Sequence, residues 1–304
     1  MDHIAIILIH YNESTDTREC VESLLALKTA QFKHHIIIVD NGSQKPLKLP
    51  KHLLTDNIEI LRSEANLGFT GGNNLGISHA TKQYQSDYFL LLNNDTVVAP
   101  EFAAQLYASA LANPKAGIIS SKIYFYKGRE FHAQSYARTQ RGRVLWYAGG
   151  TIDWASVTAF HRGVDELDRG QFDAPASVDF ATGCSMLIRR EVIERIGILD
   201  KSYFLYFEDV DFCLRARQAG FVVMMEPTSH VWHKNAGSSD GTGSRIHVYY
   251  QSRNRLYLAL RHGSTKAKIT AVRLMIQFIL RGSITERQAV LDFLLHRMGK
   301  QPIM

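Results

Sequence analysis

The chain has 304 residues, 45% of them hydrophobic and 21% charged, which is an ordinary globular composition. Its net charge of +6 suits anionic ligands or an anionic membrane surface but is far from a nucleic-acid signature, so we expect no nucleic-acid partner. Cys20, Cys184 and Cys213 lie far apart in apolar contexts, which excludes a disulfide framework and favours a reducing, cytoplasmic setting.

No segment predicts a leader or a membrane span. The apolar run over residues 4–9 is too short for a signal-peptide core and follows the acidic Asp2, so it predicts a first strand. The longest later apolar stretch, residues 269–280, is interrupted by Arg273 and Gln277, so we expect no transmembrane helix.

Strand-like and helix-like segments alternate over the first 120 residues. Strands are predicted over residues 4–9, 36–39, 58–61 and 88–92, and the first helix over residues 16–27. Alternation of this kind predicts an α/β fold with a parallel sheet covered on both faces. Ligands of such sheets bind at the carboxyl ends of the strands, so the polar turns there are candidate sites.

Three polar turns follow these strands. Asp40 begins the turn Asp-Asn-Gly-Ser at residues 40–43. Residues 66–74, Asn-Leu-Gly-Phe-Thr-Gly-Gly-Asn-Asn, open a helix; their glycines let a ligand approach the backbone, although a lone glycine-rich turn is also often structural. At residues 93–95, Asn-Asn-Asp, the carboxylate of Asp95 either holds a divalent cation or caps a helix that begins near Pro100.

Residues 121–176 are irregular and rich in aromatic residues, which suits sugar recognition, although core packing explains any single one. A strand is predicted over residues 178–188, with Thr182 and Gly183 near its centre, and a short helix over residues 189–196.

An aromatic segment at residues 204–207 leads into a helix predicted over residues 209–219. Glu208 and Asp209 then lie at its first turn, where backbone N–H groups and the helix dipole favour an ionised carboxylate. Asp209 is therefore a candidate general base. The alternative is that Asp209 is only an N-cap and Asp211 its solvated neighbour.

A further strand is predicted over residues 222–225, followed by His-Val-Trp-His at residues 230–233 and a Ser/Gly-rich loop at residues 237–244. His233 is a candidate metal ligand facing Asp95, although a lone histidine requires no such explanation. The amphipathic segment at residues 249–260 contains Arg-Asn-Arg at residues 253–255.

The tail over residues 266–297 alternates basic and apolar residues. Two interpretations are open: the tail lies on an anionic bilayer as a basic amphipathic helix, or it forms a helix hairpin that packs on the domain or on a second subunit. Peripheral contact with the inner face of the cell membrane and a homo-oligomer are accordingly both candidates.

The ordered set of motifs resembles the family 2 glycosyltransferases with a GT-A fold, and within them the bacterial rhamnosyltransferase and galactofuranosyltransferase branch. The resemblance covers roughly residues 3–262. It implies a Rossmann-like, mostly parallel central sheet flanked by helices in a domain over residues 1–262, with a nucleotide-sugar-binding half (1–120) and an acceptor and catalytic half (121–262). Residues 263–304 would be a helical extension.

The resemblance also implies roles for individual residues. Asp40 would contact the nucleotide base, and Asp95 and His233 would hold Mg²⁺ or Mn²⁺ against the donor diphosphate. Asn93 stands where the family has a carboxylate, which leaves Asp95 alone there. The donor site would comprise Tyr11, Asn12, Asp40, Asn66, Gly68, Gly72, Asn73, Asn94 and Asp95, and the acceptor site Trp232, Thr182 and Gly183.

The implied reaction is an inverting transfer with Asp209 as base and Glu208 as its neighbour. The expected donor is dTDP-L-rhamnose and the acceptor a saccharide or lipid-linked saccharide in cell-surface polysaccharide biosynthesis. Alternatives are a hexosyl or galactofuranosyl transferase with a UDP donor, or a non-catalytic nucleotide-sugar-binding module. The combination of Asp95, Asp209 and His233 argues against the module, which would need no base.

Overall fold

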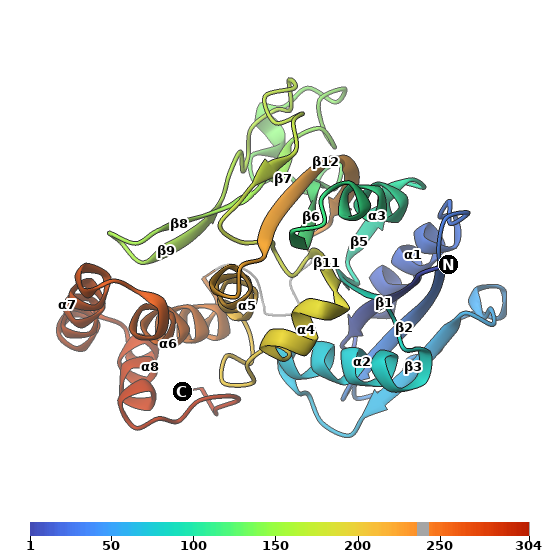
Figure 1. Ribbon diagram of the computed structural model, residues 1–304. Coiled ribbons are helices and arrows are strands. Elements are labelled where there is room, and N and C mark those ends of the chain that lie inside the picture. Colours follow the sequence, from blue (N-terminus) through green and yellow to red (C-terminus); the bar gives the residue numbers. More distant parts are fainter. Residues whose placement is uncertain (236–242, 304) are drawn as a thin grey trace.

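The computed structural model describes residues 1–235 and 243–303, so the predicted loop at residues 237–244 lies almost wholly outside the described residues. One sheet organises the described chain (Figure 1), in the strand order β10-β12-β6-β11-β4-β1-β2-β3, with β5 paired to β12 and β7 to β6. These strands are β1 (His3–His10), β2 (Lys33–Asn41), β3 (Ile58–Ser63), β4 (Tyr88–Asn93), β5 (Thr96–Val98), β6 (Ala116–Phe125), β7 (Leu145–Tyr147), β10 (Ala176–Ser177), β11 (Ser185–Arg189) and β12 (Val222–His233). A separate hairpin consists of β8 (Gly150–Asp153) and β9 (Thr158–His161).

The sheet is mostly parallel where the sequence predicted it. Strands β3, β2, β1 and β4 run parallel to their neighbours, as do β6 and β12, whereas β11 is antiparallel to both β4 and β6. Ile36, Ile37 and Ile38 in β2 are all fully buried, on both faces of the strand. That burial explains why the strand appears in the sequence as a continuous apolar run.

Five helices flank this sheet: α1 (Ser14–Leu25), α2 (Gly68–Tyr84), α3 (Phe102–Ala112), α4 (Arg190–Ile196) and α5 (Glu208–Gln218). Short 3₁₀ turns lie at Lys51–Leu53 and Ala133–Ser135. The predicted α/β fold is therefore confirmed, with helix boundaries that differ by one or two residues from the predicted ones.

Three more helices follow the sheet and lie to one side of it in Figure 1: α6 (Arg245–His262), α7 (Thr265–Arg281) and α8 (Ile284–Leu294). They share a small core of their own that also takes in Val157 from the β8–β9 turn. The core residues are Val157, Leu256, Ala259, Ala267, Ala271, Phe278, Val290 and Phe293. The tail thus forms a helix hairpin on α6, and no helix among the described residues is both long and apolar enough to cross a bilayer.

Two strand predictions are wrong in extent. The strand predicted at residues 178–188 begins only at Ser185, as β11, because a turn closed by the bond from the Ser185 N–H to the Thr182 carbonyl (3.2 Å) precedes it. The strand at residues 222–225 instead continues to His233 as β12. Its register shifts between Glu226 and His230, which lets Pro227, with no N–H to donate, sit in the strand.

Candidate active site

Polar groups meet at the carboxyl ends of β1 and β2. Tyr11 and Asn12 follow β1, and Asn12 adopts φ 62°. Its side-chain oxygen accepts from the Gln44 N–H (2.9 Å), while its own N–H donates to Ser43 Oγ (2.9 Å). Asn12 therefore fixes the turn that ends β2.

Asp40 is buried at the end of β2, where the turn that follows and Arg62 of β3 bond to its carboxylate. Its carboxylate accepts from the N–H groups of Ser43 (3.2 Å) and Leu47 (3.0 Å) and from Arg62 Nη1 (2.5 Å). Burial alone would raise the pKa of Asp40, but these hydrogen bonds outweigh it and lower the pKa below the ordinary value. Asp40 is thus a buried anion, and its contact with a nucleotide base stays a prediction.

Asn41, one residue on, ties β2 to the glycine-rich turn and was not singled out from the sequence. Its Nδ2 donates to the Gly68 carbonyl (3.0 Å), and its Oδ1 accepts from the Leu67 N–H (3.0 Å). Asn66 closes the same turn by accepting from the Gly68 N–H (2.8 Å). The signal was present in the motif Val-Asp-Asn-Gly-Ser, where the asparagine follows the carboxylate at the strand end.

The glycines of this turn are required for close packing. Gly68 adopts φ 72°, and a Cβ there would lie 2.3 Å from the Phe204 carbonyl oxygen. At Gly72 a Cβ would lie 3.0 Å from the Ile9 side chain. Asn73 is buried and donates to the Phe69 carbonyl (2.9 Å) inside α2. The glycine-rich turn therefore lies directly against the loop that precedes α5.

Asp95 and His233 meet across the β4–β5 turn and the end of β12. His233 Nε2 lies 3.1 Å from Asp95 Oδ1, and both side chains are largely buried. Asn94 beside them donates to Thr17 Oγ1 (2.8 Å). Asp95 does not cap α3, which begins at Phe102 with Glu101 as its N-cap residue.

This pair fits a divalent cation. Two ligands that share an octahedral ion at about 2.1 Å lie about 3 Å apart, close to the observed 3.1 Å. His233 Nδ1 is buried without a hydrogen-bond partner in the described part of the chain, but it points away from Asp95, so the fit to an ion rests on Nε2 and Asp95 Oδ1. Residues 1–235 and 243–303 contain no group of three or more acidic, histidine or cysteine ligands, so such an ion would take its other ligands from phosphate and water.

Glu208 and Asp209 begin α5, as the sequence predicted, but their surroundings differ. Asp209 accepts from the N–H of Gly183 (3.0 Å) and of Val210 (2.8 Å). Burial raises the pKa of Asp209 above its ordinary value, and these two hydrogen bonds offset only part of that rise. A partly exposed carboxylate with a raised pKa is suited to accept a proton.

Glu208 is buried, and its Oε2 has no hydrogen-bond partner among the described residues. Burial, and next the charge of Asp209, raise the pKa of Glu208 well above its ordinary value. Asp211 is also fully buried, unlike the solvated neighbour that the N-cap alternative assumed, and bonds to His262 Nε2 (2.7 Å) and Arg215 Nε (2.8 Å). It anchors α5 to α6.

The loop before Asp209 is strained. Phe204, Tyr206 and Phe207 have φ of 63°, 67° and 70°, a region that costs residues with a Cβ about 1–2 kcal/mol each. Asn254 of α6 holds this loop, since its Nδ2 lies within hydrogen-bond distance of the carbonyls of Tyr203 (2.9 Å), Leu205 (2.8 Å) and Tyr206 (2.9 Å).

Arg253 completes this clamp. Its guanidinium donates to the carbonyls of Ser202, Tyr203 and Gly299, and its Nε donates to Asn254 Oδ1 (3.0 Å), which orients the amide. Both clamp residues are fully buried. In the sequence, the only sign that Arg253 and Asn254 hold the loop before Asp209 was that they are adjacent polar residues inside an amphipathic helix.

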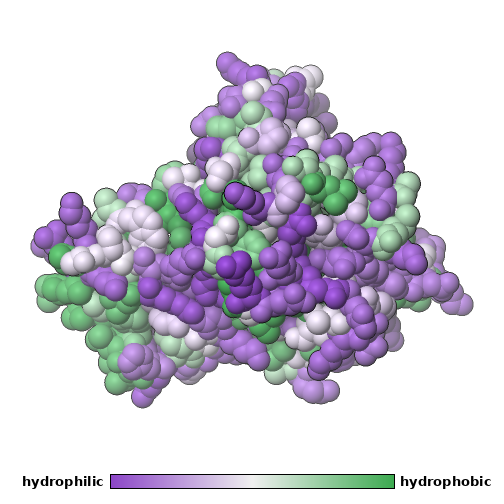
Figure 2. Space-filling model, in the orientation of Figure 1, coloured by the Kyte–Doolittle hydropathy of each residue, from purple (hydrophilic) through white to green (hydrophobic). Residues whose placement is uncertain are grey.

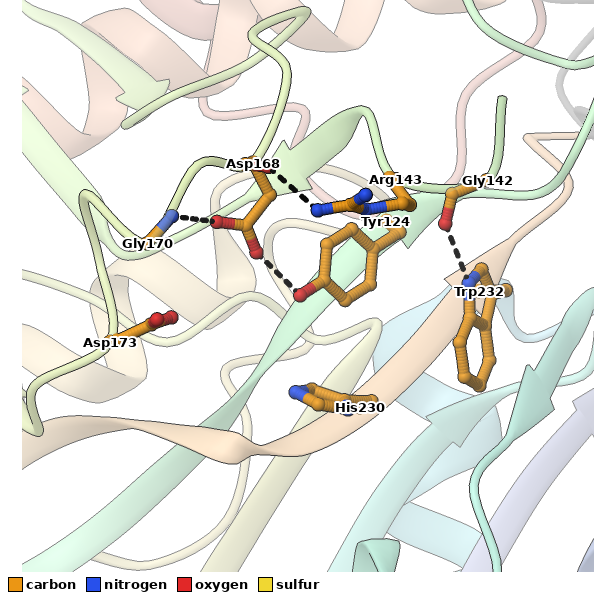
Figure 3. Close-up of a pocket in the computed structure, with 8 residues that line it drawn as sticks. All are labelled: Tyr124, Gly142, Arg143, Asp168, Gly170, Asp173, His230 and Trp232. Carbon is orange, nitrogen blue, oxygen red and sulfur yellow. Dashed lines mark hydrogen bonds between the residues drawn. The ribbon is translucent and has the colours of Figure 1, made fainter. Parts of the chain in front are cut away.

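The predicted acceptor residues separate into two places. Thr182 and Gly183 form the turn beside Asp209, whereas Trp232 donates its indole N–H to the Gly142 carbonyl (2.9 Å). Trp232 lies at a cavity of about 340 Å³, and Figure 3 shows the residues that line it: Tyr124, Gly142, Arg143, Asp168, Gly170, Asp173, His230 and Trp232. Side chains alternate along a strand, so Trp232 and His233 point to opposite faces of β12.

Similar sequences occur among curated glycosyltransferases. Among curated proteins, a low-salt glycan biosynthesis hexosyltransferase of Haloferax volcanii is 27% identical over 84% of this chain and 75% of that protein. An N-acetylglucosaminyl-diphospho-decaprenol L-rhamnosyltransferase of Mycobacterium tuberculosis is 25% identical over 83% of this chain and 81% of that protein.

A crystal structure of GalNAc-T7 with UDP, GalNAc and Mn²⁺ shares the fold, with a TM-score of 0.57 and 15% identity over 96% of this chain and 58% of that one. The family model described as glycosyl transferase family 2 matches residues 5–197, more than half of the chain. The chain therefore belongs to glycosyl transferase family 2 and is a glycosyltransferase.

Proposed function

We propose that this protein moves a sugar from a nucleoside diphosphate donor to a hydroxyl of a saccharide or lipid-linked saccharide, with inversion at the anomeric carbon. The observation that carries the proposal is Asp209, a carboxylate with a raised pKa held by two backbone N–H groups beside the glycine-rich turn.

In this reaction Asp209 takes the proton of the acceptor hydroxyl as that oxygen bonds to the anomeric carbon. The bond from the same carbon to the donor phosphate breaks, and the nucleoside diphosphate leaves with the electron pair. A base in this position typically contributes about 10²–10⁴-fold to the rate. The two N–H groups fix the Asp209 carboxylate, so it is oriented before the acceptor arrives.

Asp95 and His233 would hold Mg²⁺ or Mn²⁺. Such an ion supplies charge neutralisation for the departing diphosphate. The support is the 3.1 Å separation of their ligand atoms, together with the Mn²⁺ in the similar GalNAc-T7 structure. Asn93, which cannot add a carboxylate, leaves the affinity for the ion to Asp95, His233 and the donor.

The donor is proposed to be dTDP-L-rhamnose and the acceptor lipid-linked, in polysaccharide biosynthesis of the cell envelope. The mycobacterial relative, named as a rhamnosyltransferase acting on a diphospho-decaprenol, supports both. The archaeal hexosyltransferase supports the alternative of a hexose from another nucleotide donor, such as a UDP-sugar.

A donor screen tests the proposal. Binding of dTDP-L-rhamnose, UDP-galactofuranose, UDP-glucose and GDP-mannose is measured by calorimetry with Mg²⁺, Mn²⁺ or a chelator, and nucleotide release is measured with acceptor. Asp209→Asn should lower turnover by about 10²–10⁴-fold while donor binding persists, because only the base is lost. Asp56→Asn, at an exposed turn, is the matched control and should be indistinguishable from wild type.

Two outcomes would contradict the proposal. Turnover of Asp209→Asn at the wild-type rate would remove the base assignment. Tight donor binding without acceptor-dependent release in wild type, over a panel of lipid-linked and free saccharides, would instead favour the non-catalytic nucleotide-sugar-binding module.

A further inference from the structure

Large apolar side chains lie exposed on the hairpin of α7 and α8. Figure 2 shows hydrophobic residues gathered at the lower left of the molecule, over these helices. Their exposed fractions run from 44% at Val272 to 71% at Ile284. We call this exposed apolar set the hairpin face; its residues are Ile269, Val272, Ile276, Ile279, Leu280, Ile284, Leu291, Leu294 and Leu295.

Helix α7 has two apolar faces, and the fold uses only one. Ala267, Ala271 and Phe278 recur at a helical spacing and are buried in the small core with α6 and α8. At about 100° per residue, Ile269 and Ile276 lie on the opposite side of α7, together with the other α7 members of the hairpin face. One apolar face is enough to pack a helix on a domain, so the second is not explained by folding.

Cations border this second face. Arg273 and Lys266 lie along one edge of this second apolar face, and Lys268 lies along the other edge. Arg281 lies further around the helix on the side of Arg273. All four side chains are exposed. Helix α7 contains no acidic residue. Within the described part of the chain these four side chains form no ion pair, so their charges are available to an external anion.

This arrangement matches an anionic lipid surface. Apolar side chains enter the boundary between headgroups and acyl chains, while lysine and arginine beside them meet lipid phosphates. A second copy of this chain fits less well, because a two-fold interface would bring the same cations together. The hairpin is also preformed, since Ser264 and Ser283 cap α7 and α8, so docking requires no new helix to fold.

We propose that the hairpin face docks this protein on an anionic membrane surface, with its apolar residues among the lipid chains and Lys266, Lys268, Arg273 and Arg281 on the phosphates. This goes beyond the proposed glycosyl transfer. Binding to vesicles needs neither donor nor acceptor, so failure of one proposal is distinct from failure of the other.

Vesicle co-sedimentation of the full chain, without nucleotide sugar, tests the proposal. Vesicles of phosphatidylcholine alone are compared with vesicles in which about one third of the lipid is phosphatidylglycerol. Wild type should bind only the anionic vesicles, and added salt should weaken the binding. The triple variant Lys266→Gln, Arg273→Gln, Arg281→Gln should lose about fivefold in partitioning per cation, or roughly a hundredfold in all.

Ile276→Asp, which puts a carboxylate into the hairpin face on α7, should also lose binding to the anionic vesicles. Leu111→Asp on α3, equally exposed at 54%, and Lys82→Gln on α2 are the matched controls and should bind as wild type. Equal binding to both vesicle types, or variants that bind like wild type, would overturn the proposal. Light scattering that finds a dimer without lipid, dissociated by Ile276→Asp, would assign the face to a second copy instead.

Discussion

Glu208 and Asp209, the neighbouring carboxylates at the start of α5, lie in different environments. Asp209 is tied to two backbone N–H groups and is partly exposed, whereas Glu208 is buried with one oxygen unpartnered in the described chain. Burial raises the pKa of both, and more strongly for Glu208. Asp209 can therefore ionise and act as a base under conditions in which Glu208 retains its proton.

The retained proton of Glu208 leads to a prediction on stability. In the unfolded chain Glu208 ionises near pH 4.5, but in the fold its pKa is well above that value. As pH rises past 4.5 the folded state holds a proton that the unfolded state has lost, so the free energy of unfolding falls. Glu208→Gln removes this loss and should raise the free energy of unfolding at pH 7.

Urea unfolding of wild type and Glu208→Gln at a series of pH values measures this effect. The difference should disappear in acid, below pH 4.5, where Glu208 is protonated in both states. Since the amide mimics a protonated carboxyl, turnover should fall far less than the roughly 10²-fold or more expected for Asp209→Asn. A variant that is less stable at pH 7 would show that Glu208 is ionised in the fold.

The clamp on α6 acts at the scale of elements, because it joins that helix to the loop that precedes Asp209. Three residues of the loop have positive φ angles, and Asn254 and Arg253 hold it through the carbonyls of Tyr203, Leu205 and Tyr206. If Asp209 is the base, as proposed, Asn254 would be a positioning residue that acts through Asp209.

Asn254→Asp keeps the size of the side chain but replaces its donor with an acceptor that faces three carbonyls. The loop should relax, and a displacement of about 1 Å at Asp209 should lower turnover by about 10²-fold. Donor affinity, measured by calorimetry below the unfolding temperature, should change much less. Gln251→Glu on the same helix makes the same chemical change away from the clamp, and equal losses in the two variants would contradict the positioning role.

At the scale of the whole molecule, α6, α7 and α8 are held together by a core that is distinct from the sheet but connected to it through the clamp. Phe293 of α8 is buried in that core, while the adjacent Leu294 is 54% exposed. Comparing substitutions at Phe293 and Leu294 therefore measures how much the small core contributes to the free energy of unfolding.

Phe293→Ala should lower the free energy of unfolding by about 3 kcal/mol, the usual cost of truncating a buried phenylalanine. Leu294→Ala should change it by less than about 0.5 kcal/mol. Both are measured by thermal and urea unfolding in the absence of lipid. If Phe293→Ala unfolded in two separate transitions, the extension would be an independent unit rather than part of the catalytic body.

The sequence by itself predicted the alternation of strands and helices as far as β4, the glycine-rich turn, and the placement of Asp95 and Asp209 at element ends. Apolar periodicity and turn residues are local features, so they can be recognised from the sequence alone. It also placed both carboxylates of the 208–209 pair at the first turn of a helix, which the structure confirms.

Only the tertiary structure decided which of these side chains meet. It turned Trp232 to the other face of β12 from His233 and made Gly183, which lies in a turn rather than a strand, a donor to Asp209. It also set Asn254 on the catalytic loop and left one apolar face of α7 exposed. Such contacts depend on register, turn geometry and packing between distant segments, which no local pattern encodes.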